Sequence, residues 1–483
     1  MDQASLQNPS HSDFQAMVAL CTPRGSGAIA LIRVSGGDAI TIAASVSQLS
    51  SGTTLVSAAT HTIHHGYVID SASHERIDEV LFLLMRAPRT FTGEDTVEIT
   101  CHNNPFIIDR IINAVIAAGG RSAQPGEFTR RAFLNGKVDL VQAESINDLI
   151  HAQTEHALKQ SMAQLQGSLS QALVEFEKQL VHLLGYIEAS FEFLDEEQRD
   201  LDFDEAIRSR VANLKAFVAQ MRKSFAHQKY IRDGVRIALV GSVNVGKSTL
   251  FNTLVGHDRA IVTDIPGTTR DAVETSVYND GAFWLLVDTA GIRPTNDIVE
   301  QQGIERSFQQ AAHADIVLVV MDATRPMSAA ERAAYDDLMQ RCADKVIVVV
   351  NKIDALDPLS FSDPTLATAH SEPVEGSHPS QVLSVSAKNK TGIAQLRSAI
   401  TEKMNNLFSQ AKSPYLLNQR QFNLLTEIEV GLEGIANECA HDVHYELLAY
   451  RVKDLLEKLS QLTGKGVTEQ ILDMVFGEFC VGK

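Results

Sequence analysis

The sequence predicts a multidomain fold: an α+β N-terminal domain, an α-helical bundle, and an inserted α/β domain whose sheet is mostly parallel. Three patterns support this prediction. Short apolar runs alternate with turn residues near the N-terminus, two long stretches carry apolar residues at steps of three and four, and strand-like and helix-like segments alternate between those stretches. At 483 residues the chain is long enough for roughly two to four domains, each with its own core.

The domain boundaries are expected where these patterns change. They give an α+β domain at residues 1–138, a first helical part at 139–233, an α/β domain at 234–403 and a second helical part at 404–483. The simplest arrangement is one helical bundle built from both flanks, with the α/β domain inserted between them.

In the N-terminal domain, the apolar runs MVALC, AIALIRV, EVLFLLM and TVEIT predict strands between residues 17 and 100. Residues 105–118 and 128–134 have the pattern of helices. Mixed strands and helices of this kind predict an α+β domain.

The first helical part carries a long apolar stripe, which predicts the core face of a helix packed on a partner. The stripe consists of Leu158, Met162, Leu165, Leu169, Leu173, Phe176, Leu180, Leu184 and Ile187. A second stripe near the C-terminus consists of Leu448, Val452, Leu455, Leu459 and Leu462.

In the α/β domain, the runs VRIALVG, WLLVDT, DIVLVVMD, KVIVVVNK and VLSVSA predict buried strands. Helix-length segments separate them, which is typical of a parallel, doubly wound sheet. Residues 357–380 are rich in Ser, Pro, Thr and His, and we interpret them as a surface excursion.

Composition excludes several classes of protein. A net charge of −18 argues against a generally basic protein that coats nucleic acid. The five cysteines contain no CxxC pair, so a disulfide framework or structural zinc site is not expected, and a reducing compartment is. With no long apolar span and no targeting segment in the pattern, we expect a soluble cytoplasmic protein that does not enter a membrane.

The segment GSVNVGKS at residues 241–248 fits the phosphate-loop pattern GxxxxGKS and lies between a strand-like run and a helix-like run. Glycines let backbone N–H groups curl around phosphate oxygens. Lys247 supplies a cation to the β- and γ-phosphates, and the hydroxyl of Ser248 suits Mg²⁺. The segment therefore predicts a nucleoside triphosphate site.

Three further motifs follow in the order found in guanine-nucleotide sites. In DTAG, Asp288 ends a strand where its carboxylate can reach Mg²⁺. In NKID, Asp354 can accept two hydrogen bonds from guanine that adenine cannot offer. SAK at residues 386–388 follows the next strand. Because open α/β sheets bind ligands at the carboxyl ends of their strands, these motifs predict a Ras-like G domain that binds GTP.

The residue after DTAG is Ile292. Ras-like GTPases place a Gln there to orient the attacking water, which an isoleucine side chain cannot do. Hydrolysis therefore requires another group to orient the water, and a further positive charge near the γ-phosphate.

Further features are more specific: Asn244 in the phosphate loop, Thr268, Thr269 and Arg270 after VTDIPG, the segments FTGED and QPGEFT, and the terminal Cys-x-Gly-Lys at residues 480–483. With them, nearly the whole chain resembles the tRNA-modifying GTPase family called MnmE or TrmE. The resemblance implies a homodimeric GTPase that is activated by K⁺ and by transient pairing of two G domains.

The resemblance also implies roles for residues of the nucleotide site. K⁺ would be held by Asn244, Thr263, Ile265 and Thr268, and Mg²⁺ by Ser248 and Thr269. Glu300 would orient the attacking water, although the residue alone is also explained as a solvated acid at a helix start. GTP contacts are expected from Asn244, Val245, Gly246, Lys247, Ser248, Thr249, Thr263, Asp264, Thr268, Thr269, Asp288, Thr289, Ala290, Gly291, Asn351, Lys352, Asp354, Ser386, Ala387 and Lys388.

In this family the N-terminal domain resembles folate-binding aminomethyltransferase-type folds and holds 5,10-methylene- or 5-formyl-tetrahydrofolate. The positions that match its folate site are Arg33, Glu98, Lys137 and Lys483. A carboxylate can accept hydrogen bonds from pterin amino groups, and cationic side chains can donate to ligand oxygens. Each residue taken alone is also explained as a surface charge.

Two features of that site are open. Family members commonly read Gly-His-Gly-Gly where this chain has Cys101, His102, Asn103 and Asn104, so side chains occupy positions where backbone can approach the ligand or the dimer mate. The terminal Cys480 can act as a catalytic nucleophile or be an inert apolar residue.

The family resemblance implies a heterotetramer with the flavoprotein MnmG (GidA). The pair would add an aminomethyl or carboxymethylaminomethyl group at C5 of the wobble uridine of certain tRNAs, with tetrahydrofolate as the one-carbon source. One alternative is a ribosome-assembly or regulatory GTPase that binds RNA without modifying it, and another is a GTP-gated scaffold. The local excess of positive charge at Arg121, Arg130, Arg131 and Lys137 is either an RNA-facing surface or a solvated helix face.

Overall fold

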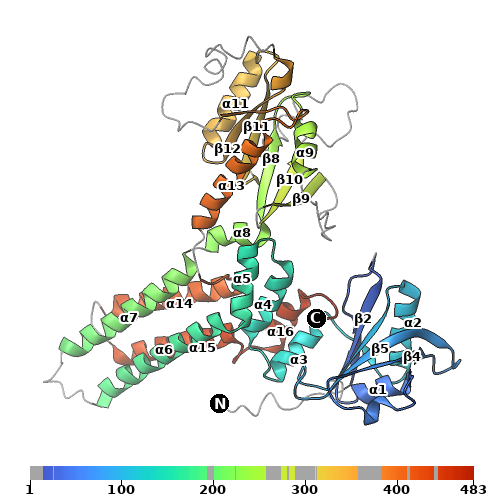
Figure 1. Cartoon of the computed structure of the whole chain (residues 1–483). Helices are drawn as coiled ribbons and strands as arrows, with labels where there is room; N and C mark the ends of the chain where they lie inside the picture. Colours follow the sequence, from blue (N-terminus) through green and yellow to red (C-terminus); the bar gives the residue numbers. More distant parts are fainter. Residues whose placement is uncertain are drawn as a thin grey trace. The chain divides into compact units, whose positions relative to one another are not determined.

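The structure, a computed structural model, describes residues 15–25, 27–192, 201–223, 225–256, 273–279, 282–288, 311, 313–356, 382–410, 414–439 and 444–483. The chain divides into two compact units. The first unit comprises Met1–Asn147, Ala163–Leu214 and Val430–Lys483, and the second comprises Asp148–Met162 and Lys215–Glu429. Each unit contains a sheet, which is blue in the first unit and green to orange in the second (Figure 1).

The sheet of the first unit has strand order β3-β4-β5-β6-β2-β1-β7 and is antiparallel except where β1 pairs with β7. Its strands are β1 Met17–Leu20, β2 Ile29–Ser35, β3 Ser47–Leu49, β4 Thr62–Ile69, β5 Arg76–Met85, β6 Thr96–His102 and β7 Arg121–Ser122. Helices α1 Ala39–Ser45 and α2 Pro105–Ala117 pack on one face of this sheet. Mixed strands and helices confirm the predicted α+β class.

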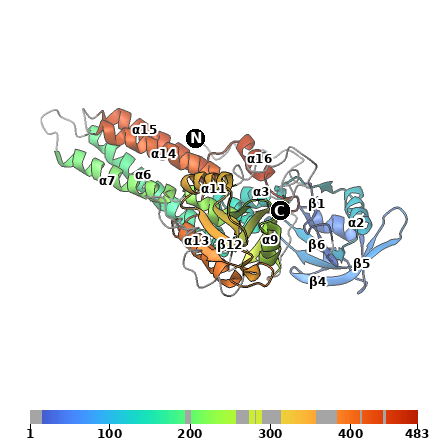
Figure 2. The same cartoon turned by 90° about the horizontal axis from the view of Figure 1, so that it is seen from above.

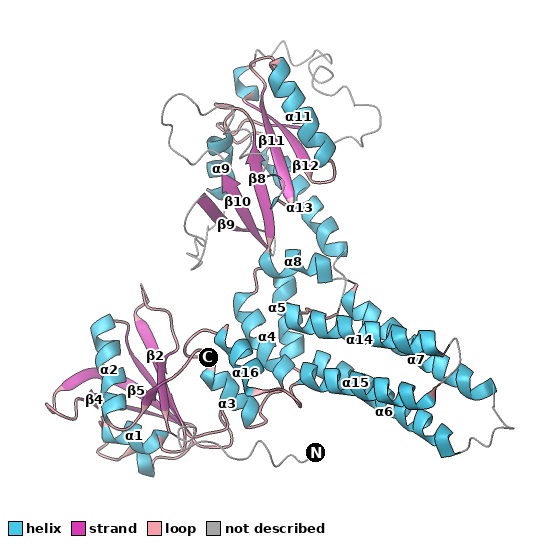
Figure 3. Cartoon of the chain, turned by 180° about the vertical axis from the view of Figure 1, so that it is seen from behind, coloured by secondary structure: helices cyan, strands magenta, loops and turns pink. Residues whose placement is uncertain are grey.

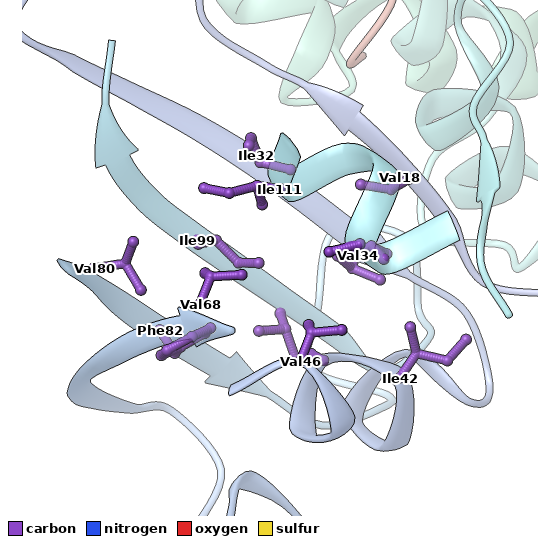
Figure 4. Packing of buried hydrophobic residues seen from close by; sticks show 14 of the residues in the cluster. Val18, Ile32, Val34, Ile42, Val46, Val68, Val80, Phe82, Ile99 and Ile111 are labelled. Carbon is purple, nitrogen blue, oxygen red and sulfur yellow. The ribbon is translucent and has the colours of Figure 1, made fainter. Parts of the chain in front are cut away.

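Alternation along the strands decides which face of this sheet is buried. In β2, Ile32 and Val34 point into the core, where they meet Ile99 of β6 and Ile111 of α2 (Figure 4). Because successive side chains of a strand point to opposite faces, Arg33 lies on the other face. The sheet therefore presents a polar site on the face that α1 and α2 leave open.

Helices from both sides of the α/β segment pack together in the first unit. Ion pairs join Lys453 to Glu188 and Lys465 to Glu177, and α6 lies beside α15 (Figure 3). This pairing confirms the predicted bundle. The described helices that are not given with either sheet are α3 Glu127–Leu134, α4 Leu140–His151, α5 Glu155–Leu165, α6 Ser168–Glu192, α7 Leu201–Arg222, α8 Phe225–Asp233, α14 Gln419–Glu438, α15 Tyr445–Thr463 and α16 Glu469–Gly477.

The apolar stripe predicted from Leu158 onward is wrong at its start. The chain leaves helical geometry between α5 and α6, where Gly167 has φ +97°. This break changes which helix face points inward, so Leu158 and Met162 are 47% and 42% exposed, whereas the buried stripe begins at Leu169.

The second unit holds a six-stranded sheet of order β13-β12-β11-β8-β10-β9, parallel except for the edge strand β9. Leu250 of α9 and Leu396 of α13 pack on one face, and Leu338 of α11 packs on the other. Figure 2 shows these three helices around the sheet. The predicted doubly wound α/β class is thus confirmed. The elements are β8 Val235–Val240, α9 Lys247–Val255, β9 Val273–Asn279, β10 Ala282–Asp288, β11 Ile316–Asp322, α11 Ala329–Arg341, β12 Val346–Asn351, β13 Val382–Ser384 and α13 Ile393–Gln410.

Candidate functional site

The phosphate loop, residues 241–248, connects β8 to α9 in the second unit. Gly246 precedes the helix with φ +96°, and a Cβ added there would lie 2.3 Å from Nδ2 of Asn351. Only glycine fits this position without strain. The loop therefore turns tightly and directs its backbone N–H groups to the N-terminus of α9, an arrangement that binds anions.

Positive charge is concentrated at this loop. Nζ of Lys247 donates hydrogen bonds to the carbonyl oxygens of Gly241 at 2.7 Å and Ser242 at 2.8 Å. Asn244 is exposed and has φ +63°, a conformation that asparagine tolerates better than most residues. The ammonium group and the positive end of the α9 dipole act at one place, which suits phosphate oxygens.

Asn351, at the end of β12, joins three of the predicted motifs. Its Nδ2 donates to the carbonyl oxygen of Val245 at 2.9 Å, and its Oδ1 accepts from the N–H of Ala387 at 3.0 Å. Oγ of Ser386 donates to Oδ1 of Asp354 at 2.6 Å. The phosphate loop, NKID and SAK therefore meet at the carboxyl edge of the sheet.

Lys352 is fixed by an ion pair with Asp322, the last residue of β11. The distance from Nζ to Oδ2 is 2.7 Å, and Thr324 donates to the other carboxylate oxygen at 2.6 Å. Burial acts to raise the pKa of Asp322, but the hydrogen bonds from Lys352 and Thr324 outweigh it and lower that pKa. The carboxylate stays ionised and holds Lys352 at the edge of the site.

The other predicted nucleotide contacts are only partly described. Ser248 and Thr249 lie in the first turn of α9, and Lys388 is exposed after β13. Asp288 ends β10 and pairs in register with Leu239 of β8, the strand that enters the phosphate loop. Outside the described residues lie Thr263, Asp264, Ile265, Thr268, Thr269, Thr289, Ala290, Gly291 and Glu300.

A second polar site lies on the open face of the first unit's sheet. Arg33 and Glu98 are direct cross-strand neighbours on β2 and β6. Both Nε and Nη2 of Arg33 lie 2.8 Å from Oε1 of Glu98, and each side chain is 16% exposed. The guanidinium also lies over the rings of Phe91 and Phe128, at 5.7 and 5.4 Å from their centroids. We call this group the Arg33–Glu98 site.

The C-terminal tail, residues 480–483, docks next to this site. The carbonyl oxygen of Cys480 accepts from the N–H of Gly126 at 3.4 Å, and that of Lys483 accepts from the N–H of Phe128 at 3.2 Å. Phe128 is the residue whose ring packs on Arg33. The tail signature and the Arg33–Glu98 site are thus brought together from opposite ends of the chain.

Cys21 also holds the tail, which sequence reasoning missed. Its thiol donates to the carbonyl oxygen of Gly482 at 3.2 Å. Burial raises the pKa of this thiol, an effect that Arg33 opposes, Glu98 adds to and Lys483 opposes. Cys21 therefore lies within electrostatic range of three of the four predicted folate-site residues. It directly follows β1, and only continued alternation of that strand could have placed it on this face.

Lys137, the fourth predicted folate-site residue, follows α3 and contacts the loop that carries Phe91. Its Nζ donates to the carbonyl oxygen of Pro88 at 3.0 Å, and its Cδ lies near Gly93. No direct contact with Arg33 or Glu98 is recorded for it among the described residues.

Residues 101–104 stand where family members commonly read Gly-His-Gly-Gly, and three of them make side-chain hydrogen bonds or ion pairs. Asn104 caps α2 by accepting from the N–H of Phe106 at 2.9 Å, and Asn103 donates to the carbonyl oxygen of Gly25 at 3.2 Å. His102 pairs with Asp78 at 2.8 Å. Burial and the charge of Asp78 raise the pKa of the buried Cys101 to about 11. The departure is therefore built into the turn before α2.

Neither interpretation of the positive cluster at residues 121–137 describes Arg131, which is buried and forms ion pairs with Glu94 and Glu127. Arg121 is partly buried and forms a two-pronged pair with Glu127. Arg130 is partly buried and pairs with the exposed Asp473. These three arginines hold α3 through ion pairs rather than forming a free basic surface.

The described residues contain no group of three or more His, Cys, Asp or Glu side chains arranged to hold a metal ion. No helix among them is long and apolar enough to cross a membrane.

Two family models match the chain. One, described as "GTP-binding protein TrmE N-terminus", matches residues 16–137. The other, described as "MnmE helical domain", matches residues 140–480, which is more than half of the chain.

Curated relatives match over nearly the full length and carry the name "tRNA modification GTPase MnmE". The protein from Koribacter versatilis is 38% identical over 97% of this chain and 99% of its own length. That from Chlorobium chlorochromatii is 36% identical over 97% and 98%, and that from Lactiplantibacillus plantarum is 34% identical over 98% and 100%.

Among solved structures, an Era variant from Aquifex aeolicus bound to GDP and AlF4⁻ is 26% identical, with a TM-score of 0.29. The match covers 41% of this chain and 66% of that one.

Proposed function

The chain belongs to the MnmE family of tRNA modification GTPases, and on this premise we propose how its two sites are used. As a member of that family it is a GTP hydrolase that acts in tRNA modification. The finer proposal is a K⁺-stimulated GTPase that works with a flavoprotein partner. Together they would add an aminomethyl or carboxymethylaminomethyl group at C5 of the wobble uridine of certain tRNAs, using a tetrahydrofolate one-carbon unit.

At the nucleotide site, the phosphate loop and Lys247 would hold the phosphates, and Asp354 would select guanine. Ser248 and Thr269 would hold Mg²⁺, which supplies positive charge to the phosphate oxygens. Asn244, Thr263, Ile265 and Thr268 would hold K⁺ in the role that an arginine finger has elsewhere. Glu300 would orient the attacking water. The tight turn at Gly246 supports the phosphate assignment, because a Cβ there would collide with Nδ2 of Asn351.

At the Arg33–Glu98 site, the hydrogen-bonding capacity supports a folate. Both bonds from Arg33 go to Oε1 of Glu98, and no partner is recorded for Oε2 among the described residues. This partly buried acceptor could take a hydrogen bond from a pterin amino group. Folate, when bound, supplies the one-carbon unit.

Docking of the tail is the observation that carries the one-carbon proposal. Lys483 would donate to an acidic group of the folate, and the exposed thiol of Cys480 would act as a nucleophile. We place Lys137 at the periphery of this site. The active assembly would be a homodimer joined to the flavoprotein as a heterotetramer, acting on tRNA in the cytoplasm.

Nucleoside mass spectrometry of tRNA from a deletion strain tests this proposal. The wild-type chain should restore the modified wobble uridine, whereas Glu98→Gln should not, although its GTP turnover should stay within about twofold of wild type. Glu75→Gln, an exposed carboxylate of the same domain, is the matched control and should restore modification.

Normal wobble uridines in the deletion strain would contradict the proposal and favour a ribosome-assembly GTPase. Full modification by the Glu98→Gln chain would contradict only the assignment of the Arg33–Glu98 site.

A further inference from the structure

Tyr335 of α11 reaches the entrance of the phosphate loop. Its side chain is 8% exposed, and its hydroxyl oxygen lies 2.9 Å from the backbone nitrogen of Ser242 and 2.9 Å from Oγ of the same residue. Ser242 is the first residue after Gly241, so it sets the direction in which the loop leaves β8. A helix 93 residues away in the sequence thus contacts the loop at two atoms of one residue.

The direction of the first hydrogen bond is fixed because a backbone N–H can only donate, so the hydroxyl oxygen of Tyr335 accepts from the Ser242 N–H. The proton of the Tyr335 hydroxyl is then available to Oγ of Ser242, which lies at the same distance. The two residues therefore form a reciprocal pair.

Glu331 is itself held in place. Its carboxylate accepts two hydrogen bonds from Arg325, at 2.6 and 3.0 Å, and one from the N–H of Ser328 at 2.9 Å. The bond from Arg325 is the main cause that holds the pKa of Glu331 well below its usual range. Glu331 therefore stays ionised and fixed in the first turn of α11, one turn before Tyr335 on the same helix.

The carbonyl group of Ser242 completes the connection to the chemistry. It accepts one of the two hydrogen bonds that locate Nζ of Lys247. A shift of Ser242 would move both the loop backbone and this ammonium group. The position of the loop backbone and the position of the Lys247 charge thus both depend on Ser242. The N–H and the hydroxyl of Ser242 contact Tyr335 of α11.

We propose that Tyr335 is a positioning residue for nucleotide binding, which holds the phosphate loop through Ser242. It does not touch the nucleotide, and it acts before hydrolysis. Loss of its hydroxyl would leave the Ser242 N–H without its acceptor and free the start of the loop. This inference concerns the GTPase site alone and does not depend on the one-carbon chemistry.

Stopped-flow release of a fluorescent GDP analogue from the full-length Tyr335→Phe chain tests the inference. Release should be roughly tenfold faster, the expected effect of one unsatisfied buried donor, and KM for GTP should rise by about the same factor. At saturating GTP, kcat should stay within about twofold. Tyr450→Phe is the control, because Tyr450 is 71% exposed on α15.

A second variant, Ser242→Ala, keeps the backbone N–H and removes the hydroxyl. Because both variants break one reciprocal pair, the effect of the double variant on release should be smaller than the product of the two single effects. Unchanged release and KM in Tyr335→Phe, even with a lowered melting temperature, would overturn the inference and leave Tyr335 a residue of the fold only. Multiplying effects in the double variant would also overturn it.

Discussion

At the residue scale, Gly482 determines whether the tail can dock. Its φ is +96°, and a Cβ at this position would lie 2.4 Å from the carbonyl oxygen of Leu20. An L-residue there would be strained in conformation and would collide with backbone, which cannot move aside as a flexible side chain can. The tail can therefore lie along β1 only with glycine at its third position.

We expect Gly482→Ala to displace the tail from the Arg33–Glu98 site. The modified wobble nucleoside should fall by about tenfold or more in cells that carry this variant, with GTP turnover within about twofold of wild type. Gly477→Ala is the matched control, because a Cβ at Gly477 meets no atom within 4 Å. Full modification by Gly482→Ala would show that the docked tail has no part in the chemistry.

Glu300→Ala tests the residue assigned to the attacking water. If Glu300 orients that water, kcat for GTP should fall on the order of 100-fold, the usual size of a lost general base or water-orienting group. The dissociation constant for GTP should change little, because the residue contacts water and not the nucleotide. An unchanged kcat would return Glu300 to the interpretation of a solvated acid.

Motifs within one segment could be predicted at this scale, and contacts between distant segments could not. Asn351 and Asp354 were predicted from NKID, and the structure shows both bonded to SAK. By contrast, the bond from Cys21 to Gly482 joins residues 461 apart in the sequence. The partner of Tyr335 was equally invisible, because a tyrosine on an amphipathic helix has the pattern of any core residue.

At the scale of elements, α3 is held by a network of charges. Glu127, at its start, accepts from Arg121 at 2.9 Å and from the N–H of Gln124 at 2.8 Å, and Arg131 is its neighbour one turn later. Burial acts to raise the pKa of Glu127, but the bonds from Arg121 and Gln124 outweigh it and lower that pKa. Because α3 also carries the N–H that binds the tail, this network supports the Arg33–Glu98 site.

Glu127→Ala should lower the stability of α3 by about 3 kcal/mol at pH 7, since it removes the partly buried carboxylate that Arg121 and Arg131 share. The loss should be measured as faster native-state hydrogen exchange of the α3 amides. Since the folded pKa is lowered, the stabilisation is present above the unfolded value of about 4.3 and is lost as pH falls through the folded value. Glu457→Ala, exposed on α15, should show neither effect.

Some elements escaped sequence-based prediction for physical reasons. The strand β4 has histidines at 64 and 65, which interrupt the apolar alternation, and its Ile63 is 65% exposed rather than buried. Helix α1 is only seven residues long and rich in alanine, so it shows no usable periodicity. The periodic helix α2 and the continuous apolar strands of the parallel sheet were predicted close to their observed bounds. For α15 the sequence predicted an apolar stripe, and its residues are buried.

At the scale of the whole molecule, the nucleotide site and the Arg33–Glu98 site belong to different compact units. The helices α4, α5, α7 and α14 each contribute residues to both units. The chain therefore passes from one unit to the other within helices, whose backbone hydrogen bonds are internal.

The proposed K⁺ site predicts a dependence of GTP turnover on the monovalent cation. Turnover should be at least tenfold faster in K⁺ than in Na⁺ at equal ionic strength, since the cation would offset charge that develops on the γ-phosphate. Steady-state phosphate release from the purified chain measures this. Equal rates in both salts would remove K⁺ from the account.

The central claim is that GTP hydrolysis in one unit drives base chemistry at the other. The most direct test is the yield of modified wobble uridine in a reaction of the purified chain, the flavoprotein, unmodified tRNA and tetrahydrofolate, supplied with either GTP or a non-hydrolysable GTP analogue. We predict product with GTP and less than about a tenth as much with the analogue. Equal yields with both nucleotides would contradict the claim.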